Sequence, residues 1–139
     1  VFVGACARIL EKSSWDGCRR VGNLVGLAFY GAVPSRRRVA IENIRVAMPH
    51  LSEAAAARIA RRAAQNLGMT FCESFRLASA GEKELLDYVS LEGAEHLQRA
   101  LERGNGAILL TAHFGNWELM GARVAHDFPF SALARPNTN

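Results

Sequence analysis

GAILLTAHFGNWE, residues 106–118, is the stretch of the chain that decides which fold the sequence predicts. Its apolar part, Ala107–Leu110, is short, follows a glycine and is compatible with β structure, as is typical of a buried strand. Gly115 and Asn116 favour a turn, and Asn116 is a suitable N-cap for a helix that begins near Trp117. The stretch therefore predicts a strand, a turn and a helix in succession.

Two residues of this stretch, His113 and Glu118, could act together chemically. On one continuous helix, residues five positions apart are rotated by about 140° from each other and cannot share a face. A strand, turn and helix remove this obstacle, because the chain turns back between His113 at the end of the strand and Glu118 in the first helical turn. The carboxyl ends of strands in α/β sheets are also where ligand crevices form.

Residues 35–81 predict a pair of helices. Ser35 and Ser52 are suited to cap them, and Pro49 ends the first helix. In the second helix an apolar residue recurs every four positions, and we expect this face to pack in the core. The face comprises Ile59, Ala63, Leu67, Phe71 and Phe75, widened by Ala60, Ala64 and Ala78.

The C-terminal part of the chain predicts the start of a parallel sheet. Residues 130–134 predict a second strand after the one at 107–110. With the helix between them, the two strands would form a right-handed βαβ unit that brings His113 and Arg135 to the same edge of the sheet. Shorter elements are expected before this unit: helices over 82–88 and 94–103, and a strand over 89–91.

We therefore expect an α/β protein in which an N-terminal helical section is followed by the start of a βαβ sheet. Residues 1–139 would form the N-terminal part of one domain. Its three sections are an apolar lead-in over 1–34, the helix pair over 35–81, and the start of the α/β core over 82–139. Because the chain begins at Val1 and ends at Asn139, just after a predicted strand, we interpret it as a piece of a longer protein.

The lead-in contains the most apolar run of the chain, Val21–Pro34. Its length of 14 residues is below the ~20 residues that a membrane-spanning helix needs. Arginines flank the run at Arg19, Arg20 and positions 36–38. Two interpretations stay open: a segment in the membrane interface with its arginines against anionic head groups, or a buried helix with solvated ends. The glycines within the run weaken a simple helix.

The positive charge of the chain is almost all arginine. The formal net charge is +4 at pH 7, and of the 17 lysines and arginines only Lys12 and Lys83 are lysines. Arginine binds phosphate in a bidentate manner, so phosphate groups or an anionic membrane surface are the partners that this charge favours. We expect no nucleic-acid binding, because the sequence has no motif for it and its aromatic residues are not interleaved with the basic ones.

The cysteines predict neither a disulfide framework nor a zinc site. Cys6, Cys18 and Cys72 are odd in number, widely spaced and without a C-x-x-C pair, so we expect thiols in a reducing compartment. Cys72 as a nucleophile is an alternative, but it falls inside a helix pattern with no histidine nearby in sequence. We expect no metal either, since the two possible ligands His113 and Glu118 do not make a site.

His113 is suited to act as a general base, because a histidine is nearly neutral at pH 7 and can accept a proton. Glu118, bonded to one ring nitrogen, would set the tautomer and stabilise the imidazolium that forms. Ser131 and Thr111 are the nearest hydroxyls and nothing marks them as activated, and the absence of G-x-S-x-G argues against a serine hydrolase. The base would then act on a substrate hydroxyl. The structural alternative is a core histidine and a capping carboxylate.

Several blocks of the sequence resemble one family in their order and spacing. HFGNWE, residues 113–118, resembles the H-x4-D/E motif of acyltransferases, and residues 90–119 resemble the segment around it. Residues 41–77 resemble a helix pair with the pattern N-L-x-x-A-F-P-x-L-S, with Met48 where the family usually has Phe. ALARPNTN, residues 132–139, is similar to an R-P-x-x-N block. Together these blocks resemble the late, lauroyl- or myristoyl-type bacterial lipid A biosynthesis acyltransferases, within the lysophospholipid acyltransferase-like superfamily.

The resemblance implies roles for individual residues. His113 would be the general base and Glu118 its partner. The donor would be acyl-carrier protein or acyl-CoA, with no further cofactor. Residues implied in substrate binding are Phe114, Gly115, Asn116, Arg135, Pro136 and Asn139.

The function expected from these observations is transfer of a fatty acyl group to a hydroxyl of a glycolipid, above all a lipid A precursor. The place expected for it is the cytoplasmic face of the bacterial inner membrane. Two alternatives are kept. One is an acyltransferase for a lysophospholipid or another glycolipid, and the other is a non-catalytic module that binds the membrane surface.

Overall fold

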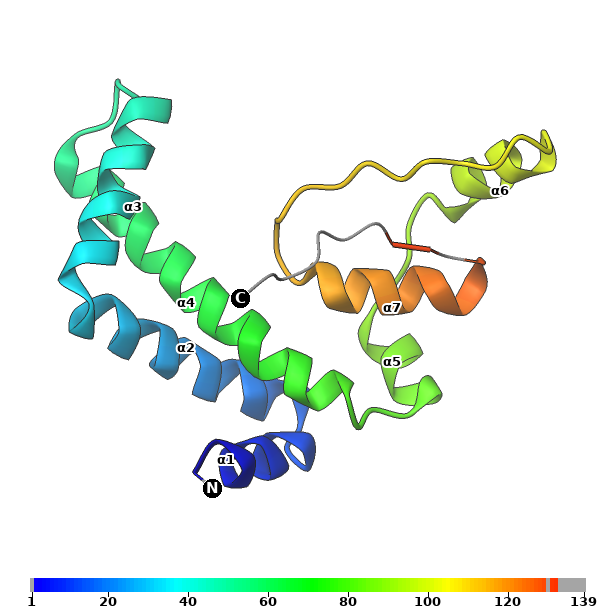
Figure 1. Ribbon diagram of the computed structural model, residues 1–139, viewed down its shortest axis with the longest axis horizontal. Helices are drawn as coiled ribbons and strands as arrows, with labels where there is room; N and C mark the ends of the chain where they lie inside the picture. Colours follow the sequence, from blue (N-terminus) through cyan, green and yellow to red (C-terminus); the bar gives the residue numbers. More distant parts are fainter. Residues whose placement is uncertain (1, 130, 133–139) are drawn as a thin grey trace, which may run out of the picture. The chain divides into compact units, whose positions relative to one another are not determined.

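The computed structural model describes residues 2–129 and 131–132, with side chains from residue 7 onward, and every regular element in this part of the chain is an α-helix (Figure 1). The chain divides into two compact units, Val1–Ala80 and Gly81–Asn139. The first unit contains α1 (Phe2–Glu11), α2 (Trp15–Ala32), α3 (Pro34–Ala47) and α4 (Glu53–Leu77). The second contains α5 (Glu82–Tyr88), α6 (Ala94–Glu102) and α7 (Trp117–Asp127).

Local signals place the helix ends of the first unit. Ser52 caps α4 as predicted, accepting a hydrogen bond from the amide of Ala55 at 3.3 Å. Ser14 caps α2 in the same way. Helix α3 begins at Pro34, whose missing N–H costs nothing in a first turn, so the predicted cap Ser35 lies one residue inside the helix.

Helices α2 and α4 are antiparallel and touch backbone to backbone. A Cβ built at Gly22 would lie 2.5 Å from the carbonyl oxygen of Gly68, and one built at Gly26 would lie 2.1 Å from that of Ala64. A Cβ at Gly68 would in turn lie 2.1 Å from the carbonyl oxygen of Gly22. No side chain fits at these distances, so the three glycines are what allow the two helices to approach so closely.

The predicted core face of α4 is correct at Ala60, which is buried, and wrong at most of its large residues. Leu67 and Phe71 are 62% and 59% exposed, and only Phe75 of the predicted face packs against the core cluster of the first unit. The cause is the close approach of α2, which leaves room between the helices for small side chains alone. The buried positions of α4 are Ala56, Ala60, Gly68, Cys72 and the carboxylate-bearing Glu73.

The pair of α2 and α4 has one polar and one apolar side. Asn23 and Gln65, which follow Gly22 and Ala64 by one position, are joined by a 2.6 Å hydrogen bond and therefore mark one side. Residues that precede a contact position are turned by about 200° from those that follow it, so they lie on the opposite side. This second side, here called the apolar side, is exposed and comprises Val21, Val25, Leu67 and Phe71.

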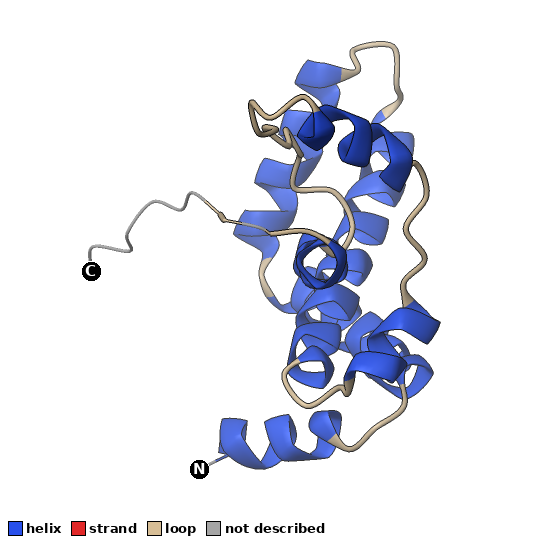
Figure 2. Cartoon of the chain, turned by 90° about the vertical axis from the view of Figure 1, so that its right-hand side faces the viewer, coloured by secondary structure: helices blue, strands red, loops and turns tan. Residues whose placement is uncertain are grey.

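The predicted βαβ sheet is not seen, and the described part of the chain is mostly helical (Figure 2). Residues 107–112 form a loop, and among the described residues they make no backbone hydrogen bond to another segment. Ile108 and Leu110 are both 97% exposed. A strand is stable only when a neighbour pairs with it, and the expected neighbour at 130–134 lies largely outside the described residues. The predicted strand over 89–91 is also a loop.

The predicted helices of the second unit are confirmed. Helix α5 spans the predicted residues 82–88, and α6 ends at Glu102, followed by Gly104 with φ 75°. Helix α7 packs against α5 and buries Leu119 and Val124. The predicted carboxylate, that of Glu118, lies in the first turn of α7.

Replacing Gly22 by alanine should separate α2 from α4. We expect the Gly22→Ala variant to lose about 1–3 kcal/mol in the free energy of unfolding, the usual cost of inserting atoms into a tight contact. Gly31→Ala is the matched control, because it lies in the same helix with no atom within 4 Å of the added Cβ. The control should keep or gain stability. Urea unfolding measures both, and equal midpoints would refute the backbone contact.

Candidate functional site

The predicted site lies on the turn that leads into α7. Gly115 has φ 61°, in the left-handed region that glycine enters at little cost. Asn116 follows and caps α7, its Oδ1 accepting a hydrogen bond from the amide of Leu119 at 3.1 Å. The predicted turn and the predicted helix start at Trp117 are both confirmed.

His113 lies on the loop before this turn and is exposed. Its ring contacts the ring of Trp117, with 5.7 Å between centroids and 56° between planes. Glu118 lies in the first turn of α7, where the unpaired amides of a helix N-terminus favour a carboxylate. The ring contact is the interaction that the structure gives for His113, and its pairing with Glu118 stays a prediction.

The other predicted residues divide into two groups. Phe114, Gly115 and Asn116 lie on the same turn as His113, with the Phe114 side chain 90% exposed. The structure therefore brings the histidine, the turn and the helix N-terminus together. The predicted residues outside the described part of the chain are Arg135, Pro136 and Asn139.

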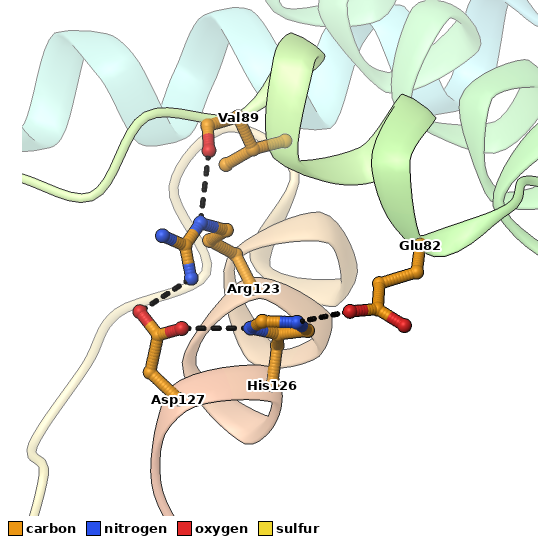
Figure 3. A network of polar contacts seen from close by, with 5 residues as sticks. All are labelled: Glu82, Val89, Arg123, His126 and Asp127. Atoms are coloured by element: carbon orange, nitrogen blue, oxygen red, sulfur yellow. Dashed lines mark hydrogen bonds and ion pairs between the residues drawn. The ribbon is translucent and has the colours of Figure 1, made fainter.

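A polar network at the other end of α7 escaped the sequence-based prediction (Figure 3). The ring of His126 lies 2.7 Å from Asp127 Oδ1 through Nδ1 and 2.9 Å from Glu82 Oε1 through Nε2. Arg123 donates through Nε to the carbonyl oxygen of Val89 at 3.1 Å and through Nη1 to Asp127. The spacing of 123, 126 and 127 signals a shared helix face. Nothing local signals Glu82, which is 44 residues away from the histidine.

The contacts in this network shift two pKa values in opposite directions. Hydrogen bonds to Asp127 first, and then to Glu82, raise the pKa of His126 above its ordinary value. Hydrogen bonds from His126 first, and then from Arg123, lower the pKa of Asp127. Both shifts favour the charged form of the group, the imidazolium for His126 and the carboxylate for Asp127.

The cysteines with described side chains are structural in character. Cys18 and Cys72 are free thiols buried in the first unit, and the thiol of Cys18 lies 3.4 Å from the carbonyl oxygen of Leu10. Burial is the main cause that raises the pKa of both thiols, which disfavours the nucleophilic thiolate. Across residues 7–129 and 131–132, no three His, Cys, Asp or Glu side chains are arranged to hold a metal ion.

Comparison with known proteins gives two matches. A family described as bacterial lipid A biosynthesis acyltransferase matches residues 2–139. Phosphatidylinositol mannoside acyltransferase from Mycolicibacterium smegmatis is 33% identical over 63 residues, which are 45% of this chain and 21% of that relative. The match thus spans about a fifth of the relative's length. No solved structure matches the chain.

Removing the cap of α7 should loosen the helix start. We expect Asn116→Ala to destabilise the first turn of α7 by about 1 kcal/mol, because the amide of Leu119 loses its acceptor. Hydrogen–deuterium exchange of residues 117–121 measures the effect. Asn116→Asp keeps an acceptor oxygen and should exchange like the wild type, so equally fast exchange in both variants would contradict the role of the cap.

Proposed function

Since the chain belongs to the bacterial lipid A biosynthesis acyltransferase family, we propose that the protein transfers a fatty acyl group from a thioester donor to a hydroxyl of a glycolipid. The observation that carries this proposal is the family match over residues 2–139, which includes the histidine block before α7. The relative named phosphatidylinositol mannoside acyltransferase supports the same reaction class.

In the proposed reaction His113 takes the proton from the acceptor hydroxyl, and Glu118 orients the ring and stabilises the imidazolium. The hydroxyl oxygen attacks the thioester carbonyl carbon and forms the new ester bond. The carbon–sulfur bond breaks, and the imidazolium returns the proton to the leaving thiolate. The exposed loop position of His113 is compatible with large lipid substrates reaching the base.

Two acceptors are proposed, in order of support. A lipid A precursor comes first, because the family description names lipid A biosynthesis. A mannosylated phosphatidylinositol comes second, because the partial relative carries that name. Both acceptors bear phosphate, for which the arginine-rich composition is suited. The donor would be acyl-carrier protein or acyl-CoA, and the other glycolipids and lysophospholipids are further acceptors to be assayed.

The place proposed for the reaction is the cytoplasmic surface of the bacterial inner membrane. Among the described residues, none of the helices combines the length and apolarity needed to cross a bilayer. The first unit instead exposes its apolar side, and α2 and α3 carry exposed arginines at Arg20, Arg36 and Arg38. Exposed apolar side chains in a unit that also exposes arginines favour the interface of an anionic membrane.

A membrane-binding module without activity would use the same surface. It differs from the enzyme in needing neither a base nor a carboxylate after the turn. The family match includes residues 113–118, the block that contains His113 and Glu118, and this supports the enzyme over the module.

Replacing the proposed base tests the reaction. We expect His113→Ala to lower the acyl-transfer rate by about 10²- to 10⁴-fold, the usual contribution of a positioned general base, and Glu118→Gln to lower it less. The assay uses defined acyl-carrier protein and acyl-CoA donors with both acceptors. His96→Ala, an exposed histidine on α6, is the control and should retain full activity. An undiminished rate for the His113 variant would exclude the mechanism.

Replacing the apolar side tests the membrane surface. We expect the double variant Leu67→Gln and Phe71→Gln to bind anionic phospholipid vesicles at least tenfold more weakly, because each apolar side chain contributes about 1.5–3 kcal/mol when it leaves water completely. Sedimentation with vesicles measures binding. Val46→Gln removes an exposed apolar side chain from α3, outside the apolar side, and serves as the control. Unchanged binding of the double variant would remove the apolar side from the membrane contact.

A further inference from the structure

The ring of His126 lies between two carboxylates, and this arrangement suits a charged imidazole. Its two ring nitrogens lie 2.7 Å and 2.9 Å from carboxylate oxygens of Asp127 and Glu82 (Figure 3). An ionised carboxylate accepts hydrogen bonds and donates none, and a neutral imidazole donates from one nitrogen alone. Both contacts are therefore hydrogen bonds at once only when the ring is an imidazolium.

The network joins α7 to both ends of α5. Glu82 is the first residue of α5, and Val89, whose carbonyl oxygen accepts from Arg123, is its C-cap. Asp127 binds both the histidine and the arginine, so the two contacts are linked. The cations also lie near the C-terminus of α7, where the helix dipole favours positive charge.

We propose that the His126 imidazolium is a pH-dependent positioning clamp, which holds the last turn of α7 against α5 and thereby fixes the loop and turn at the start of the same helix. Helix α7 has 11 residues, and a helix of that length is a rod of about 16 Å. A change at its C-terminal end therefore moves the end that carries Asn116 and Glu118. The consequence for catalysis rests on the proposed function, whereas the clamp itself does not.

The charged groups that contact the ring are Glu82 from α5 and Asp127 from α7, with Arg123 of α7 beyond Asp127. Because the pKa of His126 is raised, its stabilising contribution is complete below the ordinary histidine pKa and is lost as the pH rises through the raised one. Because the pKa of Asp127 is lowered, its contribution is lost as the pH falls through the lowered one. Between the lowered pKa of Asp127 and the raised pKa of His126, both groups are charged and the contacts of the clamp are intact.

Hydrogen–deuterium exchange of α7, corrected for the intrinsic effect of pH, tests the clamp in the wild-type protein. We expect protection of residues 117–127 to fall about two- to fivefold as the pH rises through the pKa of His126, the range for a partly exposed ion pair. His126→Gln and Glu82→Gln should show the lower protection at every pH. His96→Gln, which changes an exposed histidine beside Glu95, should follow the wild type. Protection in the wild type that does not change with pH would overturn the clamp.

The acyl-transfer rate separates this inference from the proposed function. If both hold, the wild-type kcat falls at alkaline pH, and His126→Gln removes that dependence while leaving KM little changed. A structural defect alone would lower the rate equally at every pH. If the protein transfers acyl groups but the hydrogen–deuterium exchange of α7 does not depend on pH, the clamp is overturned and the proposed function stands. Exchange that depends on pH, with no transfer to any acceptor, would support the clamp and overturn the proposed function.

Discussion

The first unit depends on the contact between the backbones of α2 and α4. Gly22 and Gly68 face each other at a separation that excludes any side chain, and the antiparallel course of the helices follows from the order of their contacts. Hydrogen bonds flank the contact, from Gln65 to Asn23 at 2.6 Å and from Tyr30 to the carbonyl oxygen of Ala57 at 3.2 Å. Glycine carries an entropic cost inside a helix, and the close contact offsets it through dispersion and buried backbone surface.

This contact also determines which side chains of the first unit are exposed. When two helices approach this closely, large side chains cannot lie between them and turn outward instead. Leu67 and Phe71 on α4, with Val21 and Val25 on α2, therefore form an exposed apolar side, opposite the bonded Asn23. The surface proposed to meet the membrane is thus a consequence of glycine packing.

In the second unit α7 connects a cap at one end with a charged network at the other. Asn116 sets where the helix begins, and His126 with Arg123 ties its last turns to α5. The predicted base precedes this helix and the predicted carboxylate lies in its first turn, so both depend on how α7 is held. In the proposed reaction, the rigid helix would keep the start of the loop in place while the exposed loop stays accessible to large substrates.

The sequence by itself determined the helices from α3 onward and the turn before α7, because a cap such as Ser52 or Asn116 acts within one helical turn of the chain. It also determined the family, through the order of its motifs. Tertiary structure alone decided which face of α4 is buried. The row through Leu67 and the row through Gly68 both repeat every four residues, and only the approach of α2 distinguishes them. Tertiary structure also decided that residues 107–112 form a loop, because a strand needs a partner to pair with. It likewise decided the ion pair of Glu82 and His126, because the attraction between charges acts through space and these residues are 44 positions apart in sequence.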